Sequence, residues 1–140
     1  MERLIVAAVL VAVAVVVALV IERRRPDPPT QASFDVPSQL DRRDFPRPDA
    51  PWLVAVFTSA TCDTCAAVAA AAAPLESDAV AVVEAEARER KDLHDRYRIE
   101  AVPAVVVADA DGVVRASFLG PVTAADLWAT VARVREGGPA

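Results

Sequence analysis

The apolar positions of this chain fall into one long block and several short ones. The long block, Leu4–Ile21, contains no charged residue, proline or glycine. As a helix rising ~1.5 Å per residue it would span roughly 27 Å, close to the ~30 Å hydrocarbon core of a bilayer. The block therefore predicts one N-terminal transmembrane helix over residues 4–21.

A cleaved signal peptide is the alternative interpretation of this block. The apolar part of a signal peptide usually has ~7–15 residues and is followed by small residues at the cleavage site. Here the run is longer, and Glu22-Arg23-Arg24-Arg25 follows it. These charged residues are typical of an interfacial stop, so a membrane anchor is favoured.

Residues 22–50 are rich in proline and charge. Seven prolines occur from Pro26 to Pro51, which is typical of an extended linker. The pattern within the segment predicts a short edge strand at 33–36 and one helical turn at 40–45, with Asp41 as its cap. We expect the folded domain to occupy residues 51–136.

Beyond residue 50, short apolar runs alternate with helical patterns. They predict strands at 53–58, 80–85, 105–108 and 113–118, and helices at 62–73, at 89–98 and from Thr123 to just before Gly137. The Asp111-Gly112 step predicts a hairpin between the last two strands. This order indicates an α/β fold, a mixed sheet flanked by helices on both faces.

Charge limits the partners and the topology. The part from Pro26 onward has 11 basic and 18 acidic residues, a formal charge of −7, which argues against a nucleic-acid partner. Arg23, Arg24 and Arg25 flank one end of the apolar block, whereas only Arg3 and the α-amino group flank the other. The positive-inside rule therefore places the domain of this single-pass membrane protein in the cytoplasm, with an extracytoplasmic domain as the alternative.

The only two cysteines form the motif Cys62-Asp63-Thr64-Cys65, between a predicted strand and a predicted helix. This layout is typical of a redox dithiol rather than a structural crosslink. The spacing predicts both sulfurs on the first helical turn, where the helix N-terminus favours a thiolate. We expect Cys62, nearer solvent, to attack a substrate disulfide and Cys65 to resolve the mixed disulfide.

The two residues between the cysteines, Asp63 and Thr64, are candidates for tuning the dithiol. Asp63 places a carboxylate beside the reactive sulfur, and like charge disfavours the thiolate of Cys62. The couple should then be reducing, with a midpoint potential nearer to about −270 mV than to about −120 mV. The alternative is that Asp63 acts only as a first-turn acid that stabilises the helix.

The chain shows no pattern for a cofactor or a metal ion. Its four glycines, at 112, 120, 137 and 138, form no phosphate-binding loop. His94 is the only histidine, and we expect it on the solvated surface of a charged helix. Two cysteines and one remote histidine fall short of the four ligands of a zinc site. We therefore predict neither a cofactor nor a metal.

Taken together, the motifs resemble the thioredoxin-like superfamily over about residues 52–134. The C-x-x-C pair follows a strand, Val102-Pro103 comes about 40 residues later, and Leu119-Gly120 precedes a C-terminal helix. The resemblance implies a thioredoxin-like sheet and a cis bond before Pro103, facing the dithiol. It also implies that the Val102 backbone pairs with an extended substrate segment and that Thr61 borders the substrate. An ordinary proline that opens the next strand is the alternative.

The chain departs from the family pattern in three ways. Thr61 replaces the tryptophan that often precedes the first cysteine, and Asp63-Thr64 replaces the Gly-Pro pair of thioredoxin. Val56 stands where thioredoxins bury an aspartate that accepts the proton of the second cysteine. Glu84 on the next strand is a candidate replacement, although a surface charge at the end of that strand is the simpler interpretation.

The sequence thus predicts a membrane-anchored thiol–disulfide oxidoreductase that uses Cys62 and Cys65 to reduce protein disulfides. Its partners would be protein thiols and disulfides, an electron donor that the sequence does not identify, and the membrane. The alternative is a thioredoxin-fold binding or scaffold module whose dithiol is slow or vestigial.

Overall fold

A computed structural model describes Met1, Val13, Val15 and residues 35–137 of the 140-residue chain. Apart from Val13 and Val15, the predicted membrane span lies outside these residues, as do the arginines after it. Among the described residues, no helix has both the length and the apolar character needed to cross a membrane. The residues from 35 onward belong to one compact unit, Phe34–Ala140.

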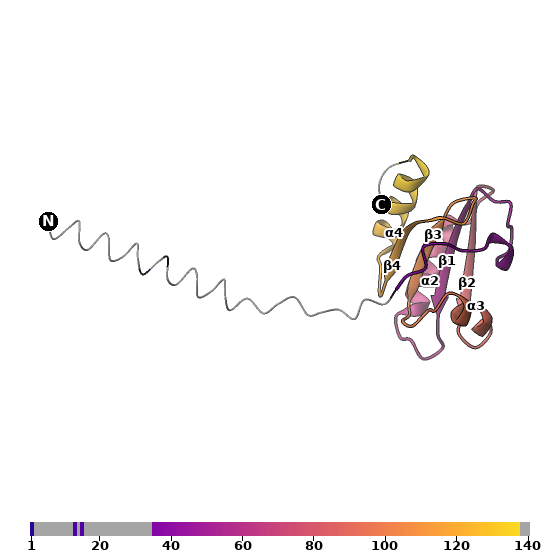
Figure 1. Ribbon diagram of the computed structural model, residues 1–140, viewed down its shortest axis with the longest axis horizontal. Coiled ribbons are helices and arrows are strands. Elements are labelled where there is room, and N and C mark those ends of the chain that lie inside the picture. Colours follow the sequence, from indigo (N-terminus) through magenta and orange to yellow (C-terminus); the bar gives the residue numbers. More distant parts are fainter. Residues whose placement is uncertain (2–12, 14, 16–34, 138–140) are drawn as a thin grey trace. The chain divides into compact units, whose positions relative to one another are not determined.

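The described part of this unit contains four strands and three α-helices (Figure 1). The strands are β1 (Trp52–Thr58), β2 (Val80–Glu86), β3 (Ala104–Ala108) and β4 (Val114–Leu119). The helices are α2 (Cys65–Ala72), α3 (Lys91–Arg96) and α4 (Ala124–Arg135), with short 3₁₀ helices η1 (Arg42–Asp44) and η2 (Ala73–Leu75). The predicted order of elements is confirmed, and the ends of each strand lie within one residue of the prediction.

Strand β1 lies in the interior of a mixed sheet with the strand order β2-β1-β3-β4. It runs parallel to β2 and antiparallel to β3, and β3 runs antiparallel to β4. A strand that is covered on both faces can be apolar at nearly every position. All of Leu53–Thr58 is buried, which explains why this run lacks the alternation of a surface strand.

Different elements cover the two faces of the sheet, because successive residues of a strand point to opposite faces. On one face, Val56 of β1 belongs to a core cluster with side chains of α2 and α4, among them Val68 and Leu127. On the other face, Phe57 belongs to a cluster with Leu93 of α3 and with residues that precede β1. The face beneath α2 is the one that matters for the dithiol.

The domain begins earlier than the predicted boundary at residue 51. The segment 35–50 crosses the face of the sheet that α3 also covers, from the β4 side to the β2 side (Figure 1). Its apolar residues Leu40, Phe45 and Ala50 are buried in the core, so this half of the predicted linker belongs to the fold. The sequence did not identify these three residues as core residues, because their spacing follows neither a helical nor a strand period and prolines and charges surround them.

The predicted edge strand at 33–36 is wrong for the residues that the structure describes there. Asp35 and Val36 lie in no strand. The segment instead meets the sheet at Gln39, which forms an isolated antiparallel bridge with Val113. The predicted turn that follows is confirmed as η1, with Asp41 as its cap.

Two side chains fasten this segment to the rest of the domain. The buried Arg42 guanidinium donates to the carbonyl oxygens of Asp109 at 2.8 Å and Ala50 at 2.9 Å. The Tyr97 hydroxyl, which follows α3, donates to the Asp44 carboxylate. Burial first, and then this hydrogen bond, raise the pKa of Tyr97 to about 12.

Both of the first two α-helices begin later than predicted. Helix α2 starts at Cys65 rather than at Cys62, and α3 starts at Lys91. Helix α2 ends at Ala72, one residue before the predicted end, and the 3₁₀ helix η2, which contains Pro74, follows it directly. Alanine favours a helix at every position of such a run. The run therefore predicts that a helix is present but not the residue at which it begins.

The prediction that His94 lies on the surface is wrong. The residue is only 9% exposed. Its ring and that of Phe57 form a T-shaped pair with centroids 5.3 Å apart, and Nε2 lies 2.8 Å from the Ala85 carbonyl oxygen. His94 therefore packs α3 against the sheet, and its charged helical neighbours masked this role.

Two turns follow the predicted chemistry. Gly112 of the β3–β4 hairpin has φ +78°, and a Cβ added there would lie 1.9 Å from the Leu40 carbonyl oxygen. The position therefore requires glycine both for its backbone conformation and for its close neighbour. At the start of α4, Thr123 Oγ1 accepts a hydrogen bond from the Asp126 N–H at 3.1 Å, so Thr123 is the N-cap of this helix.

Candidate functional site

Cys62 and Cys65 form a disulfide at the junction of β1 and α2. Their Cα atoms are 5.5 Å apart, within the usual range. Cys65 is the first residue of α2 and is 3% exposed, whereas Cys62 lies in the preceding turn and is partly exposed. The expectation of two sulfurs on the helix is thus corrected: the inner sulfur belongs to the core and the outer one to the turn.

The turn before α2 presents the outer sulfur together with three predicted site residues. The Cys62 N–H donates to the Ser59 carbonyl at 3.1 Å, which folds the turn back on itself. The Thr64 hydroxyl lies 3.9 Å from Cys62 Sγ, so this predicted tuning residue contacts the outer sulfur. Thr61 and Asp63 are exposed in the same turn, where a substrate could reach them.

The peptide bond between Val102 and Pro103 is cis, as predicted. Phe57 of β1 pairs with Ala104 of β3. Pro103 therefore lies at the edge of the sheet where β1 ends and the Cys62 turn begins. The Val102 side chain packs on the core. Neither the N–H nor the carbonyl of the Val102 backbone has a hydrogen-bond partner among the described residues.

Glu86, the last residue of β2, is a site residue that the sequence did not reveal. One carboxylate oxygen accepts from the Ala60 N–H at 3.0 Å, and the other from the N–H groups of Arg88 at 2.7 Å and Glu89 at 3.1 Å. These backbone hydrogen bonds, that from Arg88 most of all, hold the pKa of Glu86 below its ordinary value. Glu86 thereby joins the turn before Cys62 to the turn before α3.

Val56 and Glu84 are partners in the register of β1 and β2, on the face beneath α2. Val56 is buried and brings no acid to this position. Glu84 is exposed, but its carboxylate accepts a hydrogen bond from the hydroxyl of the buried Thr58 at 2.8 Å. Both residues line a cavity of about 270 Å³ that also reaches Ala69 of α2. Glu84 is therefore a surface charge near the end of β2, as the simpler interpretation expected, and its carboxylate also binds the Thr58 hydroxyl.

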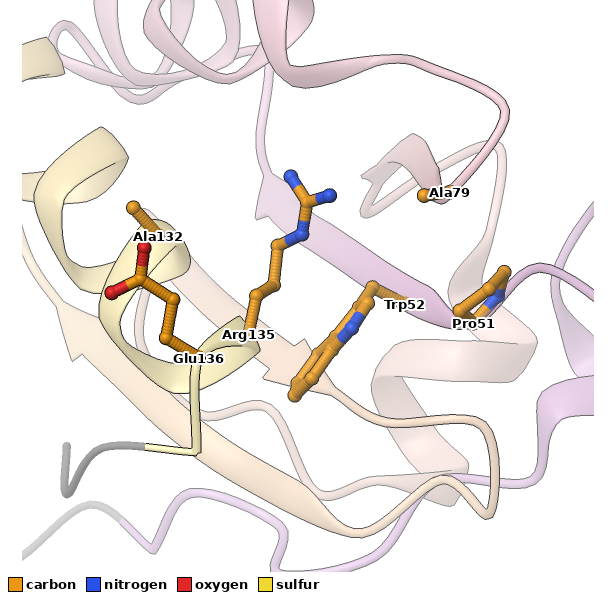
Figure 2. Close-up of a pocket in the computed structure, with 6 residues that line it drawn as sticks. All are labelled: Pro51, Trp52, Ala79, Ala132, Arg135 and Glu136. Carbon is orange, nitrogen blue, oxygen red and sulfur yellow. The ribbon is translucent and has the colours of Figure 1, made fainter.

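A hollow of about 410 Å³ lies at the opposite end of the sheet (Figure 2). Pro51 and Trp52, at the start of β1, line it together with Arg135 and Glu136, at the end of α4. The dithiol follows the other end of β1, so this hollow is separate from it. Within the described part of the chain, no three His, Cys, Asp or Glu residues are grouped so that they could hold a metal ion.

Comparisons with solved structures agree with this architecture. Deadhead, a germline-specific thioredoxin from Drosophila melanogaster, matches with a TM-score of 0.54 and 21% identity, over 62% of this chain and 84% of that one. Thioredoxin O2 from Arabidopsis thaliana, in its oxidized state, matches with a TM-score of 0.51 and 20% identity, over 61% of this chain and 76% of that one. A malarial protein matches with a TM-score of 0.53 and 14% identity, over 59% of this chain and 94% of that one.

No protein-family model and no curated protein sequence matches the chain. At the low identities of the structural matches, the likeness establishes the fold. The strand order, the flanking helices and the turn between β1 and α2 agree with it. This chain therefore has a thioredoxin-like fold, and it carries the Cys62–Cys65 disulfide where β1 leads into α2.

Proposed function

We propose that this protein is a thiol–disulfide oxidoreductase that reduces protein disulfides through Cys62 and Cys65. One observation carries the proposal: on a thioredoxin-like fold, a disulfide joins a partly exposed Cys62 to a buried Cys65 at the start of α2. The outer sulfur can meet a protein substrate, whereas the inner sulfur is shielded from it. A disulfide that only crosslinks the chain does not require one sulfur to be exposed and the other buried.

The proposed reaction is an exchange in two steps. The Cys62 thiolate attacks a substrate disulfide and forms a mixed disulfide, and the other substrate sulfur leaves as a thiolate that takes up a proton. The Cys65 thiolate then attacks Cys62 Sγ, which releases the second substrate thiol and leaves the Cys62–Cys65 disulfide. A reductant of the thiol class must return two electrons and two protons to restore the dithiol.

The backbone of Val102 supplies a place for the substrate to bind. Its N–H and carbonyl have no partner among the described residues, and it lies next to Pro103 at the edge of the sheet where the Cys62 turn begins. An extended peptide can satisfy both groups by pairing with them, as in strand addition. This pairing would hold a substrate disulfide beside the outer sulfur.

The N-terminal block of the chain would tether the domain to a membrane. Asp35 and Val36 line a small cavity with Ala104 and Leu119, so the described chain begins near the end of the sheet that carries the dithiol. A tether attached there would keep the dithiol close to membrane-bound substrates and raise their local concentration. We place the domain in the cytoplasm on the positive-inside rule. Labelling of Cys62 by an impermeant maleimide in intact and in lysed cells tests this topology.

Insulin reduction by the full-length chain, with dithiothreitol as the reductant, tests the proposed activity. We expect turnover by the native protein and none by Cys62→Ser, and we expect Cys65→Ser to accumulate a mixed disulfide with insulin. Ala66→Ser is the matched control, because it places the same side chain one residue after Cys65 without removing a sulfur. If neither dithiothreitol nor an enzymatic reductant supports turnover, the chain is instead a binding or scaffold module with a vestigial dithiol.

A further inference from the structure

Strand β2 forms one edge of the sheet, with β1 as its neighbour on the inner side (Figure 1). The Trp52 N–H of β1 donates to the Ala79 carbonyl at 2.9 Å. Bonding to one neighbour alternates along a strand, so every second residue from Ala79 onward bonds to β1. The backbone groups of Val82, Glu84 and Glu86 therefore point outward, away from the sheet.

Two of the outward backbone groups already have partners, and these lie at the two ends of the row. The Val82 N–H donates to the Glu76 carboxylate at 2.6 Å. The Glu86 carbonyl accepts from the Arg90 N–H at 2.8 Å. The four groups between them are the carbonyl of Val82, both groups of Glu84 and the N–H of Glu86. None of these four has a hydrogen-bond partner in the described part of the chain.

This row of backbone groups fits a short strand that runs parallel to β2. In a parallel pair, a residue donates to the residue before its partner and accepts from the residue after it. A segment whose central residue lies opposite Glu84 would satisfy all four groups through its two flanking residues. Residues further along the segment would meet groups that Glu76 and Arg90 already occupy. The edge thus has room for three residues of a parallel strand.

The side chain of the central residue would lie on the face beneath α2, because laterally paired residues of a sheet point to the same face. A cavity of about 270 Å³ lies on this face, with Glu84 at its wall. The apolar part of its lining consists of Val56, Ala69, Ala73 and Val82. The Glu84 carboxylate meets no cation in the described part of the chain. A side chain with an aliphatic stem and a cationic end complements both features.

We propose that the edge of β2 binds a short extended segment of a partner protein, parallel to β2, with a lysine or arginine opposite Glu84. The cation pairs with the Glu84 carboxylate, and the aliphatic stem covers the apolar wall of the cavity. The proposal does not depend on the redox activity, because it uses no residue of the dithiol turn.

A second copy of this chain is a poorer occupant of the edge. Two β2 strands related by a two-fold axis perpendicular to the sheet would pair antiparallel. If they used the same four groups, Glu84 of one copy would lie opposite Glu84 of the other. Like charges directly opposite each other destabilise a strand pair. Charge therefore favours a basic partner over self-association.

The peptide TTVKVTT, capped at both ends and labelled with fluorescein, is a probe for this edge. Fluorescence anisotropy with the oxidised full-length chain measures its affinity. We expect saturable binding that Glu84→Gln weakens by about two- to fivefold, since a partly exposed ion pair contributes modestly. Glu136→Gln should leave the affinity unchanged. It is the matched control, because it makes the same change in charge beside the hollow at the opposite end of the domain (Figure 2).

Peptides methylated on single backbone nitrogens test the pairing without any change to the protein. In a parallel pair the N–H groups of the two valines point to β2, and that of the lysine points away. Methylation of either valine should therefore abolish binding, whereas methylation of the lysine nitrogen should leave it unchanged. In an antiparallel pair the residue opposite Glu84 donates to it, so loss of binding on methylation of the lysine overturns the parallel arrangement.

No binding to the native chain at millimolar peptide overturns the proposal, and so does equal weakening by Glu84→Gln and Glu136→Gln. A native chain that sediments as a dimer and binds the peptide only as it dissociates would assign the edge to a second copy instead. Tighter binding after residues 26–34 are replaced by a Gly/Ser segment of equal length would assign the edge to that part of this chain. Either result would also refute a basic partner segment as the occupant.

Discussion

Reduction of the Cys62–Cys65 disulfide should lower the free energy of unfolding of the domain. The size of the effect depends on the length of the loop that the disulfide closes. The two cysteines are 3 residues apart. In the chain-entropy model, closing so short a loop removes about 6 cal/mol/K from the unfolded chain, or about 1.7 kcal/mol at 25 °C. For a domain of roughly 100 residues this corresponds to a fall in Tm of about 7 °C.

The sign of this difference bears on the direction of the reaction. If the disulfide stabilises the folded domain, linkage requires that the midpoint potential of the Cys62–Cys65 couple is lower in the folded protein than in the unfolded chain. The folded dithiol is then the stronger reductant. A difference of about 1.7 kcal/mol corresponds to about 35 mV. Stabilisation of the Cys62 thiolate at the start of α2 works in the opposite direction, because it favours the reduced form.

Urea unfolding of the oxidised and the reduced protein, followed by circular dichroism, measures the difference. We expect the oxidised form to unfold at the higher urea concentration, with the same slope for both forms. The Cys62→Ser/Cys65→Ser double variant should unfold at one midpoint with or without reductant. A reduced form that is more stable than the oxidised form would refute the reasoning, since thiolate stabilisation would then exceed about 1.7 kcal/mol and the dithiol would be an oxidant.

Three further changes test other parts of the structure. Tyr97→Phe removes the hydrogen bond to Asp44 and should cost about 1–2 kcal/mol. Because the pKa of Tyr97 is raised from 10.0 to about 12, its contribution is complete below about pH 10 and is lost as the pH rises through about 12. Urea midpoints against pH should therefore fall over this range less steeply in the variant. Gly112→Ala should destabilise by at least about 2 kcal/mol, because its Cβ would lie 1.9 Å from the Leu40 carbonyl oxygen, and an unchanged urea midpoint would contradict this. Asp63→Asn should raise the midpoint potential by on the order of 10–20 mV, measured by equilibration with glutathione, and an unchanged potential would leave Asp63 as a helix-stabilising acid only.

The features that sequence predicted are those in which the pattern itself carries the constraint. Leu53–Thr58 is short and almost entirely apolar, and this pattern is typical of a strand that is buried on both faces. The C-x-x-C pair at the end of that strand placed the dithiol, and the segment ending in Pro103 placed the cis bond. Each of these signals lies within a few consecutive residues.

The features that sequence missed depend on backbone groups far away in the chain. Arg42 is buried because carbonyl oxygens of two other segments accept its hydrogen bonds. His94 is buried because the Ala85 carbonyl lies within reach of its ring. Among the residues that the structure describes, Glu86 accepts hydrogen bonds only from backbone N–H groups. Every residue has a backbone carbonyl and every residue except proline has a backbone N–H, so no pattern of residue types identifies such partners.

The backbone of Val102, which has no hydrogen-bond partner in the described part of the chain, also has a consequence for selectivity. Main-chain groups are alike in all proteins, so a docking position built from them discriminates little between one polypeptide and another. Under the proposed function, the choice among client proteins would then depend on location, because the proposed membrane anchor would limit the reaction to exposed disulfides within its reach. Exchanging the N-terminal block for an unrelated membrane anchor should accordingly bring the proposed oxidoreductase to other client proteins while its chemistry stays the same.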